Sequence, residues 1–104
     1  MGVPMQGVYA MTKASIISMT KTLATELGTD GIRVNAIAPG LIETQFSQAL
    51  TQNEVLRDRI LERTALKKIG RPEDVAALAA FLASDDADYI TGAVMCVDAG
   101  WTVS

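Results

Sequence analysis

Helix-forming and strand-forming segments alternate along this chain, and their order restricts the folds open to it. Apolar residues at helical spacing predict a helix over 9–27, and a short run with β-branched residues predicts a strand over 32–38. A second pair follows, with a helix beginning at Pro72 and a strand over 93–97. This order is typical of parallel strands joined by a right-handed helical crossover, so we expect an α/β fold.

The expected sheet is small for the helices that would cover it. Two strands make a marginal sheet by themselves, and both runs are largely apolar, as strands are when both of their faces are covered. The helix over 9–27 carries apolar residues on more than half of its circumference and would pack on two sides. We therefore interpret residues 1–104 as one partial α/β domain.

Composition excludes several classes of function. The chain has no histidine, which removes Ser–His and Cys–His catalysis and the HExxH zinc site, and we expect no metal. Its 12 acidic and 9 basic residues form no basic run, so a nucleic-acid partner is not expected. The longest charge-free apolar stretch, 75–84, is far too short to cross a bilayer. The single cysteine, Cys96, fits a cytoplasmic protein and is expected to be a small buried residue.

A tyrosine and a lysine stand four residues apart near the start of the first helix. Tyr9 and Lys13 would share one helix face, about 6 Å apart along its axis. A free tyrosine has a pKa of about 10, and a nearby cation favours the phenolate and lowers that pKa. Such a phenol can exchange a proton with a substrate oxygen, while a lysine can hold sugar hydroxyls. The alternative is a surface pair that stabilises the helix by roughly a few tenths of a kcal/mol.

The segment that holds Tyr9 and Lys13 is the first of several short motifs along the chain. In order they are YAMTK at 9–13, RVNAIAPG at 33–40, LIET at 41–44, GRPEDVA at 70–76, YITG at 89–92 and VDAG at 97–100. In this order and at these separations they resemble the C-terminal part of the classical short-chain dehydrogenase/reductase family. The resemblance covers essentially the whole chain. It implies the C-terminal portion of a doubly wound, Rossmann-type parallel sheet, with about two strands and flanking helices.

The resemblance implies an oxidoreductase, and it implies a role for Tyr9 and a role for Lys13. Tyr9 matches the family's general acid/base. Lys13 matches the lysine that binds the nicotinamide ribose and lowers the tyrosine pKa. The implied reaction transfers a hydride between NAD or NADP and a small alcohol or carbonyl substrate.

A second group of residues matches the family's nicotinamide-facing segment. Pro39 and Gly40 match a turn whose backbone passes close to the nicotinamide ring, although an ordinary turn at a strand end would read the same way. Ile42 matches a backbone contact to the carboxamide. Thr44 matches a hydroxyl near the carboxamide and the pyrophosphate, and it could also be the N-cap of the next helix. Asn35 matches a strand asparagine that we interpret as structural.

Residues 45–64 correspond to the family's substrate lid, and we expect one or two short helices there. The apolar side chains of this lid would contact substrate or would only pack the lid down, and both roles stay open. They are Phe46, Leu50, Val55, Leu56 and Ile60.

Several parts of the family pattern have no counterpart in these 104 residues. The TGxxxGxG turn, the catalytic serine and the NNAG asparagine would all lie before Tyr9. One interpretation is a C-terminal piece, weakly active or inactive alone, whose dinucleotide-binding half comes from a longer parent or a partner chain. The alternative is a non-catalytic remnant that acts only by association with itself or with full-length relatives, the homo-oligomer forming through the 9–27 helix and the C-terminal strand region. A weaker third interpretation is a reductase-like fold without redox chemistry.

Overall fold

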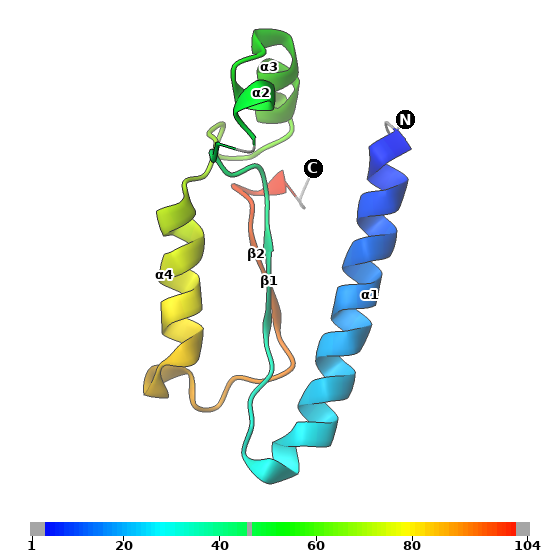
Figure 1. Cartoon of the computed structure of the whole chain (residues 1–104), viewed down its shortest axis with the longest axis vertical. Coiled ribbons are helices and arrows are strands. Elements are labelled where there is room, and N and C mark those ends of the chain that lie inside the picture. The colour runs from blue at the N-terminus through cyan, green and yellow to red at the C-terminus, as the bar shows by residue number, and fades with distance from the viewer. Residues whose placement is uncertain (1–3, 46, 102–104) are drawn as a thin grey trace. The chain divides into compact units, whose positions relative to one another are not determined.

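The computed structural model describes residues 4–45 and 47–101 (Figure 1), with only the backbone described for residues 4–9 and for Leu50. The chain divides into two compact units, one of Met1–Ala36 with Ser84–Met95 and one of Ile37–Ala83 with Cys96–Ser104. The elements follow in the order α1 (Pro4–Leu27), η1 (Gly28–Asp30), β1 (Ala36–Pro39), α2 (Gln48–Thr51), α3 (Glu54–Glu62), α4 (Pro72–Ala83), η2 (Asp85–Ala87) and β2 (Val94–Val97), where η marks a 3-10 helix.

The two strands pair in parallel, as the alternation of elements predicts. The Ala36 amide donates to the Ala93 carbonyl at 2.9 Å, and the Gly40 amide donates to the Val97 carbonyl at 2.9 Å. The offset between partners is constant along the pair, which is the pattern of a parallel ladder. Both strands contribute residues to each unit. The expectation of an α/β fold with about two parallel strands is confirmed for the described residues.

The first strand begins later than predicted, at Ala36 rather than Ile32, and includes Pro39. Before it, side chains make cross-strand bonds alongside one backbone bond, in which the Gly92 amide donates to the Val34 carbonyl at 2.8 Å. The Val34 amide donates to Thr91 Oγ1 at 3.0 Å. The Asn35 side chain donates from Nδ2 to the Ile90 carbonyl and accepts from the Ala93 amide, both at 3.0 Å. Asn35 therefore has the structural role expected for it.

Helix α1 ends at Leu27 as predicted, but it begins at Pro4 and its termination differs. Gly28, the glycine directly after the predicted helix, does not end the helical turns. Instead, a 3-10 turn continues through Asp30, and Gly31 adopts the left-handed conformation with φ of 74°. The Gly31 amide donates to the Gly28 carbonyl at 3.0 Å. Glycine suits position 31 because it adopts the left-handed conformation without the strain that a Cβ would add.

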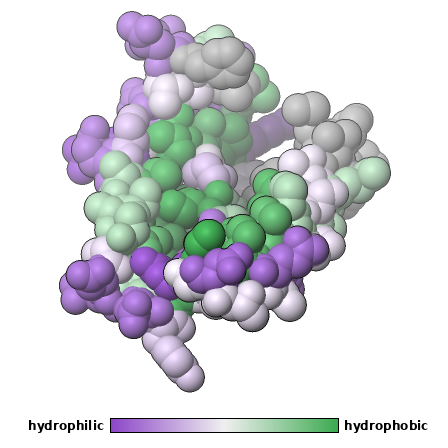
Figure 2. Space-filling view, turned by 60° about the horizontal axis from the view of Figure 1, so that its bottom comes forward, coloured by the Kyte–Doolittle hydropathy of each residue, from purple (hydrophilic) through white to green (hydrophobic). Residues whose placement is uncertain are grey.

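One side of α1 is covered within its own unit and another is open. Thr20 and Ala24 are buried, and Ala24 Cβ would lie 3.6 Å from a Cβ built on Gly92. Met11 and Met19 lie on the open side and are 73% and 57% exposed. This helix was expected to pack on two sides, and the described residues cover one of them. Figure 2 shows apolar side chains on the surface of the protein.

The buried core is small. Among the described residues the buried apolar side chains are Ala24, Leu82 and Ala87, and no large side chain is fully buried. Cys96 is exposed, so the prediction that it is buried is wrong. The physical reason is that a two-stranded sheet offers little cover to side chains that alternate along each strand. No helix in the described part of the chain is long and apolar enough to cross a membrane.

Helix α4 begins at Pro72, as its sequence predicts. Glu73 and Asp74 lie in its first turn, and Asp74 Oδ2 accepts a hydrogen bond from the Arg71 amide at 2.8 Å. This carboxylate satisfies a backbone donor near the positive end of the helix dipole. Val75 and Leu78 are partly covered and Leu82 is buried, and their spacing places these three side chains on one side of the helix.

Replacing Asn35 by alanine should destabilise the chain by about 2 kcal/mol, because two backbone groups, Ile90 C=O and Ala93 N–H, lose their partner. Urea unfolding followed by circular dichroism measures the loss. Asn53 is the matched control: it caps α3 at an exposed site, accepting from the Val55 and Leu56 amides, and Asn53→Ala should cost about 1 kcal/mol. A larger loss for Asn53→Ala than for Asn35→Ala would contradict the assignment.

Candidate active site

Helix α1 carries the predicted proton-transfer pair. Tyr9 and Lys13 both lie within its continuous helical backbone, so their i and i+4 positions fall on one face. The side chain of Tyr9 lies outside those that the structure describes. Lys13 is partly covered. The backbone therefore provides the spacing that the chemistry needs, in the unit that contains α1.

The predicted nicotinamide-facing segment belongs to the other unit and follows β1 directly. An isolated parallel bridge joins Ile42 to Gly70. The Gly70 amide donates to the Leu41 carbonyl at 3.0 Å, and the Glu43 amide donates to the Gly70 carbonyl at 2.8 Å. The amide and carbonyl of Ile42 itself therefore point away from Gly70. No hydrogen bond among the described residues engages the Ile42 N–H, which leaves a donor for a ligand.

Ser47 holds this segment in shape, and the sequence interpretation missed it. Its Oγ donates to the Ile42 carbonyl at 2.6 Å and accepts from the Thr44 amide at 2.9 Å. In return, Thr44 Oγ1 accepts from the Ser47 amide at 3.2 Å. The reciprocal bonds resemble a capping box, and the T-x-x-S spacing was the available signal. Helix α2 begins only after Ser47, so Thr44 caps the turn before the helix, and the residue as a whole is exposed.

Gly40 lies against Asp98 more closely than any side chain would permit. A Cβ built on Gly40 would be 2.9 Å from both Cα and Cβ of Asp98. Real Cβ atoms do not approach backbone so closely, so glycine is required here by packing. Gly40 is therefore a close-packed glycine at the end of β1, and this packing is compatible with either role expected for the Pro39–Gly40 turn.

The lid segment forms two short helices, as predicted, and α2 and α3 lie next to one another (Figure 1). Five apolar residues were expected either to contact substrate or to pack this segment down. Of these, Phe46 and the side chain of Leu50 lie outside the described part. Val55 and Leu56 are 67% and 40% exposed. Ile60 is partly covered and borders a cavity.

The structure brings Pro39, Gly40, Ile42 and Thr44 together on one short stretch of backbone. Tyr9 and Lys13 lie in the other unit. Within the described residues, no cluster of three or more His, Cys, Asp or Glu side chains could hold a metal ion.

Comparison with known proteins identifies the family. A family model described as enoyl-(acyl carrier protein) reductase matches residues 1–102. The chain is 47% identical over 102 residues to the 3-oxoacyl-(acyl-carrier-protein) reductase of Thermotoga maritima, covering 98% of this chain and 41% of that protein. It is 44% identical over 97 residues to a tropinone reductase homolog of Arabidopsis thaliana, covering 93% of this chain and 32% of that protein.

Solved structures agree in fold. A 4-hydroxyisoleucine dehydrogenase complexed with NADH matches with a TM-score of 0.88 and 36% identity, over 94% of this chain and 40% of that one. A putative 2-deoxy-D-gluconate 3-dehydrogenase of Agrobacterium tumefaciens with bound NADP matches with a TM-score of 0.86 and 44% identity, over 92% and 39%. The chain belongs to the short-chain dehydrogenase/reductase family and has its α/β, Rossmann-like fold. It spans about a third to two fifths of the length of the curated relatives it matches.

Replacing Gly40 by alanine should destabilise the chain by about 2 kcal/mol or more, because backbone atoms of Asp98 cannot yield to the new Cβ. Gly28 is the matched control, since a Cβ built there meets nothing within 4 Å. Gly28→Ala should change the free energy of unfolding by no more than about 1 kcal/mol in either direction. Urea denaturation measures both, and similar losses in the two variants would contradict the close-packed turn.

Proposed function

We propose that this chain forms the proton-transfer and nicotinamide-facing part of an NAD(P)-dependent oxidoreductase that interconverts an alcohol and a carbonyl compound. The observation that carries the proposal is the Tyr9–Lys13 spacing on the continuous helix α1 of a chain that belongs to this family. Matched solved structures contain NADH or NADP. The proposal leaves open which of the two cofactors binds.

In the proposed reduction, the Tyr9 phenol donates its proton to the carbonyl oxygen of the substrate as that oxygen gains negative charge. Lys13 acts in two ways, by holding the nicotinamide ribose and by favouring the phenolate that remains. When bound, the nicotinamide supplies the hydride. In the oxidation the proton moves from the alcohol to the Tyr9 phenolate.

The segment after β1 fits the nicotinamide end of the cofactor. The Ile42 N–H is a donor without a partner among the described residues, and such a donor suits a carboxamide oxygen. Thr44, two residues later, is an exposed residue whose hydroxyl accepts from the Ser47 amide at 3.2 Å. Ser47 fixes the backbone of both. We assign Pro39, Gly40, Ile42 and Thr44 to cofactor binding, together with Tyr9 and Lys13.

In this proposal residues 1–104 are the C-terminal part of a Rossmann-type domain, and 45–64 are its lid. The chain spans only 32% and 41% of the length of two relatives, which is compatible with a part of a longer domain. The dinucleotide-binding half would come from the rest of a longer protein or from a partner chain. A cytoplasmic location stays a prediction from the sequence.

A non-catalytic role is the second candidate, favoured by the open side of α1. Met11, Met19 and Leu23 are 73%, 57% and 38% exposed along this helix. Apolar area of this kind is covered when a second copy or a full-length relative packs on it. Homo-oligomer formation through α1 and the region of β2 is part of either candidate function.

Tyr9→Phe should lower kcat by about 10²- to 10⁴-fold once the chain is completed, because the phenol that transfers the proton is gone. The assay follows NADPH oxidation after the chain is joined to the N-terminal segment of the Thermotoga maritima reductase. Tyr89→Phe is the control, since this other tyrosine is fully exposed on the surface. Equal rates for Tyr9→Phe and Tyr89→Phe would remove Tyr9 from the mechanism.

The 104-residue chain by itself should not bind NADH or NADPH, because most of the family's dinucleotide-binding surface lies outside the matched region. A titration that follows reduced-nicotinamide fluorescence measures this directly. Saturable binding by the isolated chain would contradict the need for a second half, and it would also exclude the non-catalytic remnant.

A further inference from the structure

Ser47 lies at the N-cap position of α2 but does not cap that helix with its side chain. A serine at this position ordinarily accepts a hydrogen bond from an amide in the first turn of its own helix, and this bond stabilises the helix. The Ser47 side chain makes no such bond, although α2 has only four residues. Its hydroxyl is directed instead to the segment before the helix, so a short helix lacks its cap while that segment gains a support.

The Ser47 hydroxyl joins two peptide groups of the proposed cofactor segment. A hydroxyl has one proton to donate and two lone pairs with which to accept. Ser47 Oγ lies 2.6 Å from the Ile42 carbonyl oxygen and 3.3 Å from the Thr44 carbonyl oxygen, so its proton goes to the nearer Ile42. The Thr44 amide donates to the same Oγ at 2.9 Å. One side chain thereby holds the residues on either side of Glu43.

Gly70 holds the alternate residues of the same segment. Its amide donates to the Leu41 carbonyl at 3.0 Å, and its carbonyl accepts from the Glu43 amide at 2.8 Å. Residues 41 and 43 are thus fixed by Gly70, and residues 42 and 44 are fixed by Ser47. The Ile42 N–H, which has no partner among the described residues, is therefore held in place from two sides.

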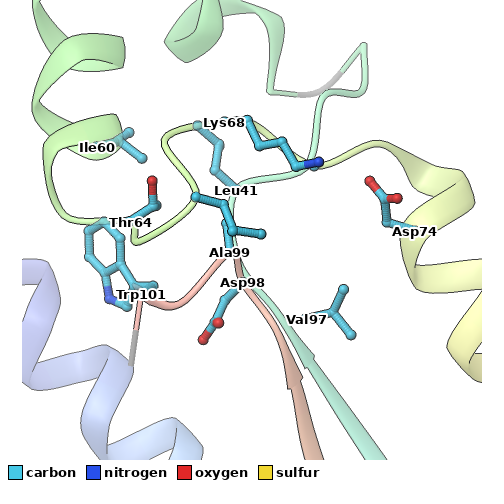
Figure 3. A pocket seen from close by; sticks show the side chains of 11 residues that line it. Leu41, Ile60, Thr64, Lys68, Asp74, Val97, Asp98, Ala99 and Trp101 are labelled. Carbon is cyan, nitrogen blue, oxygen red and sulfur yellow. The ribbon is translucent and has the colours of Figure 1, made fainter. Parts of the chain in front are cut away.

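Packing gives this segment little further support. The Leu41 side chain borders a cavity of about 280 Å³ between α3 and the ends of β1 and β2 (Figure 3). Leu66 and Ala99 belong to the wall of this cavity, and the Leu66 amide donates to the Ala99 carbonyl at 2.9 Å. At the other end of the segment Thr44 is exposed. Because neither end is packed into a core, hydrogen bonds rather than burial determine the conformation of the segment.

We propose that Ser47 is a positioning residue that sets the affinity of the protein for its nicotinamide cofactor. This role rests on the proposed function, because it takes the segment after β1 as the cofactor segment. Ser47 acts through the backbone of Ile42 and Thr44 and touches no reacting atom. Without its hydroxyl, two backbone groups lose their partner and the cofactor itself has to order the segment. That cost is the same in the ground state and the transition state, so cofactor binding weakens while kcat does not change.

The test uses the chain joined to the N-terminal segment of the Thermotoga maritima reductase. The Kd values for NADPH and NADH are measured by reduced-nicotinamide fluorescence, and kcat is measured in the assay used for Tyr9→Phe. Ser47→Ala should raise the Kd of the better-bound cofactor about tenfold. Its kcat at saturating cofactor should change by less than about twofold. Ser47→Thr keeps the hydroxyl and should restore the Kd to within about threefold of wild type.

Asn53→Ala is the matched control for a purely structural effect. Asn53 caps α3 by accepting from the Val55 and Leu56 amides, so its loss weakens the same lid segment without removing a bond to residues 41–44. The Kd for the cofactor should therefore stay at its wild-type value. Equal rises in Asn53→Ala and Ser47→Ala would overturn the role of Ser47. Loss of the cooperative urea transition in Ser47→Ala would overturn it too, because Ser47 would then support the fold as a whole.

The outcomes distinguish this inference from the proposed function. A raised Kd in Ser47→Ala, combined with equal rates for Tyr9→Phe and Tyr89→Phe, would support the role of Ser47 and reject the proposed proton transfer. An unchanged Kd in Ser47→Ala, combined with a slower Tyr9→Phe, would overturn the role of Ser47 and leave the function in place. A joined protein that binds neither cofactor would overturn both.

Discussion

The hydrogen bonds between β1 and β2 join parts of the chain that are more than fifty residues apart, and the remaining structure depends on them. The ladder continues through the Gly40 amide to the Val97 carbonyl and brings Gly40 against Asp98. That approach sets where the backbone turns after Pro39, and hence where Leu41 to Thr44 begin. The same strand end receives the segment after α3, through Leu66 and Ala99. The pairing of β1 and β2 therefore positions both the proposed cofactor segment and the wall of the cavity.

The residues of the proposed site lie on two kinds of backbone, a regular helix and a short irregular segment. Helix α1 provides a phenol and an ammonium from one regular element, and this requires nothing beyond helical spacing. The segment after β1 is different, because the bridge to Gly70 engages the neighbours of Ile42 and Ser47 engages its carbonyl. A short irregular segment needs such external supports, whereas a helix does not.

Features that depend on neighbouring residues could be predicted from the sequence, whereas features that depend on residues far away in the chain could not. The start of α4 at Pro72 was predictable, because Pro72, Glu73 and Asp74 act within one turn. The start of β1 was not, because it depends on Thr91 and on the reach of Asn35 to Ile90, about 55 residues away. Trp101 and Arg63 meet only because α3 and β2 end near each other. The burial of Cys96 was wrongly predicted, since burial depends on how much sheet surrounds a strand and no local pattern reports that.

The two-stranded sheet has a consequence for the handling of the protein. Each strand has only one neighbour among the described residues, so each presents a row of backbone donors and acceptors along its outer edge. Edges of this kind pair with other chains, and the degree of pairing rises with protein concentration. Association through such an edge would make the melting temperature of this chain depend on protein concentration. Values taken at a single concentration describe that sample and not the fold.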